Sequence, residues 1–161
     1  MKYRRGIGIF LINSEKKLWV GKRIDNKNNY WQMPQGGIDK YETEEQAMKR
    51  EMFEEVGIND SFEILGMSKN LLSYDLPKEI IKFVWNGKYI GQSQRWFFCK
   101  FIGIDSMFDL EKDDNPEFCE WKWIEPNECI SEVVPFKRSL YREVLQAVSY
   151  THLTLPTTPY V

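Results

Sequence analysis

Short apolar runs separated by polar, turn-forming segments dominate the chain, and this pattern predicts a protein rich in β-strands. Strands are predicted at residues 6–12, 18–22, 62–68, 80–85, 94–103 and 120–124. The first two runs are joined by four polar residues, which indicates a hairpin, and the Asn86-Gly87 pair predicts a turn. The run 94–103 carries aromatic side chains on both of its faces, which favours a central strand of a sheet.

Two segments have the period of an α-helix instead. The first begins at Thr43, which forms a capping box with Gln46, and ends at Gly57, a residue suited to the left-handed stop. Its predicted buried face repeats every four residues and has an aromatic beside it: Met48, Met52, Val56 and Phe53. The second helix runs from residue 136 or 137 to about 148. Strands interleaved with two helices predict an α/β fold in which a mixed β-sheet lies between helices, an α/β/α sandwich.

Composition fits one soluble globular domain, placed here at residues 1–148 of the 161. Hydrophobic residues make up 42% of the chain and charged residues 29%, which excludes a disordered protein. No run approaches the roughly 18 apolar residues of a membrane span, and no signal peptide opens the chain. We therefore expect a cytoplasmic protein without a membrane partner. The net charge of −2 gives no indication of a DNA-binding protein, and no DNA partner is expected.

Residues 149–161 (SYTHLTLPTTPYV) lack charge and are rich in Thr, Pro and Leu. This tail is interpreted as cloning read-through, with a short native tail as the alternative, and it is excluded from functional reasoning. It contains the only histidine, His152, so hydrolases that use a serine or cysteine with a histidine lack their base. Three cysteines without a CxxC spacing predict neither a disulfide framework nor a zinc site.

Three glutamates of the first helix could form a binding site for a cation. Glu51, Glu54 and Glu55 stand at positions i, i+3 and i+4, so a helix projects all three from one side. Like charges at this spacing cost a few tenths of a kcal/mol per pair, about 0.2–0.5, so something should neutralise them. Oxygen-rich clusters suit hard divalent cations such as Mg²⁺. The alternative is a solvated charged face that the glutamates share with Lys49 and Arg50.

The spacing around these glutamates resembles the Nudix box, which spans residues 36–58 here (GGIDKYETEEQAMKREMFEEVGI). The polar and glycine positions of that motif are all matched: Gly36, Glu42, Arg50, Glu51, Glu54, Glu55 and Gly57. The motif marks hydrolases that cleave a nucleoside diphosphate linked to another group. The resemblance implies the Nudix α/β/α sandwich with a mixed sheet, and a loop, a helix and a second loop over the motif.

The resemblance also implies a role for most of these residues. Metal binding falls to Glu51, Glu54 and Glu55, and a carbonyl in the loop at Gly36 could complete the shell. Mg²⁺ is the expected ion, with Mn²⁺ as the second choice. Arg50 would hold the glutamates in place through charge-assisted hydrogen bonds, and the loop would be braced by a further residue, Glu42.

Beyond the motif, residues 3–145 resemble the bacterial RNA pyrophosphohydrolases and the related dinucleoside polyphosphate hydrolases. The pieces that match include YR at 3–4, WQMPQGG at 31–37, IGQ at 90–92, PEF at 116–118, WKW at 121–123 and VVPFKR at 133–138. The implied activity removes pyrophosphate from the 5′ end of triphosphorylated RNA, which promotes mRNA decay. Hydrolysis of small dinucleoside polyphosphates is the alternative. A non-catalytic nucleotide- or RNA-binding module is a third, and the intact carboxylate set argues against it. Whether an accessory protein takes part stays open from the sequence.

The same resemblance makes Glu117 a further metal ligand or the general base, against the alternative of an exposed loop glutamate. Either Glu54 or Glu117 would take the proton from the attacking water while Arg50 supports the site.

Substrate contacts are expected from residues outside the motif. Arg4 and Phe136 resemble a pair that sandwiches a base, because aromatic and guanidinium planes stack on any base. Phe136 as a plain core aromatic is the alternative. Arg23 and Lys137 would neutralise phosphates, although surface cations are usually only solvated. Weaker candidates for polar contacts near the terminal nucleotide are Gln92 and Tyr74.

Overall fold

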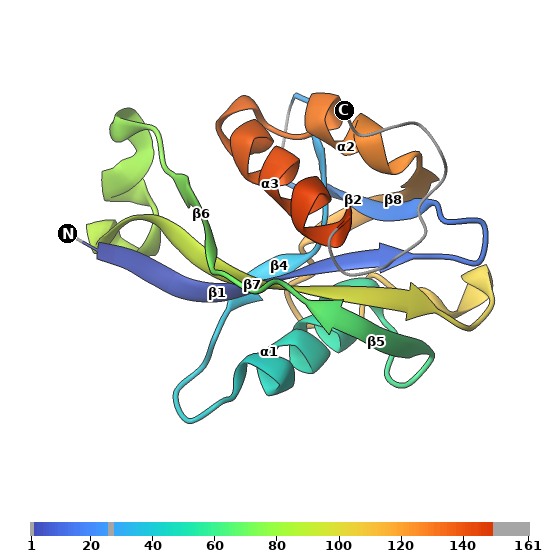
Figure 1. Ribbon diagram of the computed structural model, residues 1–161. Helices are drawn as coiled ribbons and strands as arrows, with labels where there is room; N and C mark the ends of the chain where they lie inside the picture. The colour runs from blue at the N-terminus through green and yellow to red at the C-terminus, as the bar shows by residue number, and fades with distance from the viewer. Residues whose placement is uncertain (1, 26–27, 150–161) are drawn as a thin grey trace.

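The computed structural model describes residues 2–25 and 28–149, and it confirms the predicted sandwich. A mixed sheet separates α1 on one face from α2 and α3 on the other (Figure 1). The strands are β1 Lys2–Ile12, β2 Leu18–Arg23, β3 Trp31–Gln32, β4 Gln35–Gly37, β5 Phe62–Met67, β6 Leu72–Asp75, β7 Tyr89–Phe101 and β8 Phe118–Ile124. The α-helices are α1 Glu44–Glu51, α2 Cys129–Glu132 and α3 Arg138–Ser149.

The two longest strands form the centre of the sheet. β1 pairs with β7 in parallel over its whole length, and the other strand pairs of the described chain are antiparallel. The main order is β3-β2-β1-β7-β5, with β4 beside β1, β6 beside β7 and β8 beside β2. The central position predicted for the aromatic run is confirmed by this order. Short β4 carries the beginning of the motif onto the middle of the sheet.

The alternation of side chains along β1 divides the core into two layers. Ile7, Ile9 and Leu11 face α1, whereas Phe10 and Ile12 face α3, and all five are buried. β7 divides its aromatic residues in the same way, because successive side chains of a strand point to opposite faces. Within the described residues, no helix is both long and apolar enough to cross a membrane.

The strand predicted at residues 80–85 is wrong. That segment forms two 3₁₀ turns, Lys78–Phe83 and Trp85–Gly87, which no strand pairs with. Four of its apolar residues, Ile80, Ile81, Val84 and Trp85, pack against the α3 side of the core, which explains a hydrophobic run without a sheet. The strand that pairs with this part of β7 is β6, which the sequence analysis did not predict. Its buried and exposed positions alternate. The turn at Asn86-Gly87 is confirmed by positive φ angles of 57° and 70°.

The remaining differences are small. β1 and β7 begin earlier than predicted, and β3, β4 and α2 are short elements that were not predicted. The last helix follows a 3₁₀ turn at Pro135–Lys137 and includes Ser149, which had been placed in the tail. The rest of that tail, residues 150–161 with His152, lies outside the described residues. The cysteines are free, Cys99 and Cys129 being buried and Cys119 exposed.

Candidate functional site

The predicted helix divides into an α-helix and a wider turn, and this division brings the glutamates together. Thr43 caps α1 with the expected capping box. After Glu51 the chain continues as a π-helical turn, Met52–Val56, closed by a hydrogen bond of 3.0 Å from Gly57 N to Met52 O. Gly57 then ends the helix with φ 86°. Single π-helical turns inside helices often occur at functional sites.

This geometry gathers three carboxylates into one cluster. One oxygen from each of Glu51, Glu54 and Glu55 lies within 4.8 Å of the others. Glu51 is only 8% exposed and Glu55 only 5%. Met48, Met52 and Val56 are buried as predicted, but the prediction is wrong for Phe53, which is 41% exposed. At 3.6 residues per turn Phe53 lies about 100° from Met52, on the flank of the buried face.

Arg50 forms the frame of the cluster. Its guanidinium donates to Glu51 Oε1 at 2.8 Å, to Glu54 Oε2 at 3.3 Å and to Glu42 Oε2 at 2.8 Å. A further hydrogen bond of 2.9 Å reaches Gly37 O in β4. Arg50 therefore ties the helix to the loop before it, and its positive charge offsets part of the repulsion between the glutamates.

The electrostatics fit a divalent cation. Burial raises the pKa of Glu51 to about 7, against the opposing effect of Arg50. Burial, reinforced by the negative charge of Glu117, raises the pKa of Glu55 to about 9. Glu55 Oε2 is buried and, among the described residues, has no hydrogen-bond partner. Buried acceptor oxygens that lack a proton donor suit a hard cation, which takes oxygen ligands.

The absence of a side chain at Gly36 leaves room for the Glu51 carboxylate in the cluster. A Cβ at Gly36 would lie 2.2 Å from Glu51 Oε1, so a side chain there would displace the carboxylate. Gly36 lines the same cavity as the glutamates. Whether its carbonyl is a ligand stays a prediction.

Glu117 completes the wall opposite the helix. It precedes β8 and lines a cavity of about 510 Å³ together with the three helix glutamates. Arg23 Nη1 donates to Glu117 Oε1 at 2.8 Å, and Arg23 also pairs with Asp25. The loop between β7 and β8 contributes Asp113 to this cavity, a residue that the sequence analysis did not single out.

A second cavity of about 480 Å³ adjoins the first, and the two share Arg4, Arg23, Gly36 and Glu117 among their lining residues. Its size falls within the roughly 300–1,000 Å³ of ligand pockets. All six predicted substrate contacts line this second cavity: Arg4, Arg23, Tyr74, Gln92, Phe136 and Lys137. The fold thus brings together side chains that are far apart in the sequence.

The aromatic and basic residues of this cavity are held by other side chains of its wall, and the sandwich of a base between Arg4 and Phe136 stays a prediction. Phe136 packs on Tyr74, with ring centroids 6.0 Å apart. Arg4 instead lies over Trp85, its Cζ 5.2 Å from the ring centroid. Lys137 is 5% exposed, and burial, assisted by the nearby Arg23, lowers its pKa to about 7. Lys137 is therefore not a solvated surface cation.

Two buried glutamines also line this cavity. Gln92 is 1% exposed and Gln32 is 4% exposed. The Nε2 atom of each has no hydrogen-bond partner within the described part of the chain, although a buried donor left unpaired costs about 1–3 kcal/mol. Gln32 was not predicted as a site residue. Its only sequence signal was its place in the WQMPQGG segment.

These observations define the class of the protein. A helix bearing three clustered carboxylates lies between two loops, and it is held against the mixed sheet of an α/β/α sandwich. The chain matches the NUDIX domain model over residues 2–144, and it belongs to the Nudix family. Enzymes of this family use divalent metals, in agreement with the acidic cluster.

Curated relatives cover nearly the whole chain. The chain is 43% identical over 148 residues to an RNA pyrophosphohydrolase of Wolbachia pipientis subsp. Culex pipiens (strain wPip), covering 92% of this chain and 90% of the relative. It is 45% identical over 145 residues to the RNA pyrophosphohydrolase of Pelagibacter ubique (strain HTCC1062), with 90% of each chain covered.

Solved structures share the fold at low identity. The E. coli dihydroneopterin triphosphate pyrophosphohydrolase aligns with a TM-score of 0.68 at 15% identity, covering 92% of this chain and 99% of its own. A C. elegans Ap4A hydrolase complex aligns with a TM-score of 0.64 at 20% identity, covering 91% and 98%.

Proposed function

We propose that this protein is a Nudix pyrophosphohydrolase that removes pyrophosphate from the 5′ end of triphosphorylated RNA and so promotes mRNA decay. The observation that carries the proposal is the union of two cavities, one lined by carboxylates and the other by aromatic and basic side chains. A triphosphate and the nucleotide that bears it need these two environments side by side. Identity of 43–45% to curated RNA pyrophosphohydrolases supports the same assignment.

Divalent cations, Mg²⁺ first and Mn²⁺ second, would be held by Glu51, Glu54, Glu55 and Glu117. When bound, such ions neutralise phosphate charge and lower the pKa of a coordinated water. The chain's own contribution is to hold the carboxylates in place before the ions arrive. Arg50 does this for the helix, and Arg23 does it for Glu117 through their 2.8 Å ion pair.

Hydrolysis requires a base that accepts the proton of the attacking water while the water oxygen bonds to phosphorus and a phosphoanhydride P–O bond breaks. Glu54 and Glu117 are the two candidates. Glu54 has the most exposed side chain of the three clustered glutamates, 31%, so it can meet solvent at the cavity. Glu117 faces both cavities. The variant with the greater loss of kcat, Glu54→Gln or Glu117→Gln, will identify the base.

Substrate recognition would follow from the second cavity. A base would lie near Phe136 and Arg4, where stacking contributes about 1–3 kcal/mol per base. Arg23 and Lys137 would bind phosphate oxygens, and a negatively charged phosphate would favour the charged form of the buried lysine. The unpaired amides of Gln32 and Gln92 would donate hydrogen bonds to substrate oxygens or nitrogens.

The alternative substrate is a dinucleoside polyphosphate, since the same cavity could hold a second base. Initial rates on a triphosphorylated RNA oligonucleotide and on diadenosine tetraphosphate, at equal low concentrations with Mg²⁺, separate the two. The proposal predicts a higher kcat/KM on RNA, with pyrophosphate and 5′-monophosphorylated RNA as products. A higher value on the dinucleotide would contradict it.

A further inference from the structure

Residues 78–88, here called the arm, form one wall of the second cavity. The arm connects β6 to β7 and stands at one end of the sheet, on the same face as α3 (left in Figure 1). Three of its residues line the cavity: Ile80, Val84 and Trp85. Phe83, by contrast, is 76% exposed and is not among the residues that line it. The arm therefore directs one aromatic side chain inward and another outward.

Trp85 is held in an unfavourable backbone conformation. Its φ is 50°, and Asn86 and Gly87 follow with φ 57° and 70°. A positive φ is common for glycine and tolerated by asparagine, but it is strained for a bulky residue. Hydrogen bonds from Gly87 N to Val84 O (2.9 Å) and from Lys88 N to Trp85 O (3.2 Å) keep the turn in this shape. Backbone strain of this kind is concentrated at active sites and ligand-binding sites in proteins.

The indole holds a cation between the arm and the motif. Arg4 Cζ lies 5.2 Å from the centroid of the Trp85 ring, within the roughly 6 Å of a cation–π contact. On the side of the motif, Arg4 packs so closely on Gly37 that a Cβ there would lie 2.1 Å from Nη2. Tyr89 supports the indole from β7 by an edge-to-face contact at 6.1 Å. Arg4 is thereby fixed at the junction of the two cavities.

We propose that Trp85 is a positioning residue that determines substrate specificity: it fixes Arg4 and closes the second cavity around a base of one of the first two nucleotides. This inference rests on the proposed function. Without the indole, the flexible Arg4 side chain must be ordered by the substrate itself, which weakens binding. Trp85 does not line the carboxylate cavity where the phosphates would be cleaved. Removing the indole should therefore raise KM and leave kcat unchanged, and the rise in KM should require a base on the substrate.

The test compares wild type and Trp85→Ala on triphosphorylated oligonucleotides that are intact, abasic at the first nucleotide or abasic at the second. On the intact oligonucleotide we expect KM to rise roughly tenfold, the scale of one stacking contact, with kcat within about twofold. On one of the two abasic oligonucleotides wild type and variant should become equal. Equal losses on all three substrates, a loss confined to kcat, or no loss would each overturn the proposal.

Matched variants separate positioning from folding. Phe83→Ala removes an aromatic from the same arm without touching the cavity and should leave KM unchanged. Trp85→Phe keeps a ring over Arg4 and should recover most of the affinity. Thermal unfolding of all three variants checks that the fold is retained. If Trp85→Phe were no better than Trp85→Ala, the cation–π contact would not be the cause and the proposal would fail.

The same series distinguishes this proposal from the proposed function. If wild type cleaves diadenosine tetraphosphate but not RNA, the RNA assignment fails on wild-type data alone. The Trp85→Ala effect is then measured on diadenosine tetraphosphate against adenosine tetraphosphate, which lacks a second base. A loss on the dinucleotide alone assigns Trp85 to the second base and equal losses on both substrates assign it to the first, whereas no loss on either substrate refutes its role.

Discussion

The two cavities of this protein are built in opposite ways. The carboxylate cavity takes three of its four glutamates from one helical segment, tied by Arg50 to the loop before it. The second cavity draws on β1, the arm, β6, β7 and the turn before α3, which the sheet alone brings together. Chemistry that resides in one contiguous motif can be recognised from local spacing. Specificity that is assembled by topology depends on contacts that no local pattern contains.

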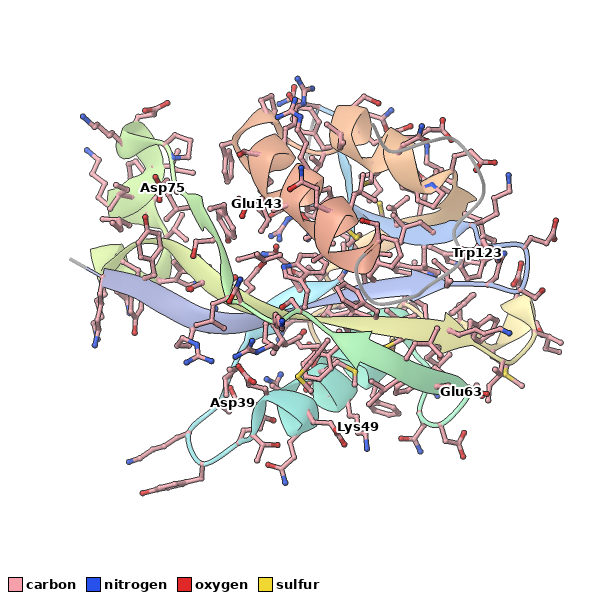
Figure 2. The ribbon with its side chains drawn as sticks, in the orientation of Figure 1. Asp39, Lys49, Glu63, Asp75, Trp123 and Glu143 are labelled. Atoms are coloured by element: carbon pink, nitrogen blue, oxygen red, sulfur yellow. The ribbon has the colours of Figure 1, made fainter. Side chains whose placement is uncertain are left out.

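The largest effect is expected in the first cavity. Glu54→Gln keeps the size of the side chain but removes the carboxylate, and kcat should fall by at least about a hundredfold, the scale of lost acid–base catalysis. Lys49→Gln is the control, because Lys49 lies on the outer side of the same helix and pairs with Glu45 (Figure 2). Near-normal turnover by Glu54→Gln with Mg²⁺ present would contradict the role given to this glutamate.

A smaller effect is expected in the second cavity. Gln32→Leu removes the unpaired amide that would bind substrate, so kcat/KM should fall by about tenfold. The melting temperature should rise, because leucine buries no hydrogen-bond donor without a partner. Gln94→Leu is the matched control. Gln94 bonds to Gln35, Gln92 and Trp96, so its loss should lower the melting temperature. A destabilised Gln32→Leu would show that the amide is structural.

The pH dependence of stability distinguishes the glutamates from ordinary surface acids. Glu51 and Glu55 have their pKa values raised from 4.5 to about 7 and about 9, so between about pH 5 and 7 the folded chain binds more protons than the unfolded chain. The contribution of these two groups to the free energy of unfolding without metal is therefore greatest below about pH 4.5. It declines as the pH rises through their folded-state pKa values. Urea unfolding at several pH values measures this slope.

Variants assign that slope to its groups. Glu55→Gln should flatten the decline, since a glutamine does not titrate. Excess Mg²⁺ should stabilise wild type more at pH 7 than at pH 5, because the ion competes with protons for the same oxygens. If Glu55→Gln left the pH dependence of the free energy of unfolding unchanged, that dependence would not arise from Glu55.

The smallest effect concerns Phe53. Because it is 41% exposed, Phe53→Ser should change the free energy of unfolding by no more than about 0.5 kcal/mol, whereas a buried aromatic would cost several. Chemical denaturation measures the difference. If Phe53→Ser lowered the free energy of unfolding by more than about 2 kcal/mol, Phe53 would belong to the buried face, as the helical period predicted.

Phe53 also illustrates which parts of the structure the sequence could predict. A period of 3.6 describes α1 but not the π-helical turn after it. Phe53 lies on the flank of the buried face, about 100° from Met52, so the pattern did not decide its burial. The arm was mistaken for a strand because an apolar run predicts burial without specifying a partner strand. β6 took that place with only four residues. The capping box, the left-handed Gly57 and the central strand depend on local rules, and all three were predicted correctly.

The same division holds for the site. The spacing of Glu51, Glu54 and Glu55 was enough to predict that they would meet. The contact of Arg4 with Trp85 and the unpaired amide of Gln32 depend on strand register and on the shape of the arm. Neither can be deduced from the order of residues alone.

Calorimetric titration with Mg²⁺ and with Mn²⁺ tests the central claim most directly, namely that the buried glutamates exist to bind divalent ions. Wild-type protein, shown by circular dichroism to be folded, should bind at least one of the two metals, and a Glu51→Gln/Glu55→Gln double variant should lose that binding while remaining folded. Folded wild type that takes up neither ion, or a double variant that binds as tightly, would contradict the account.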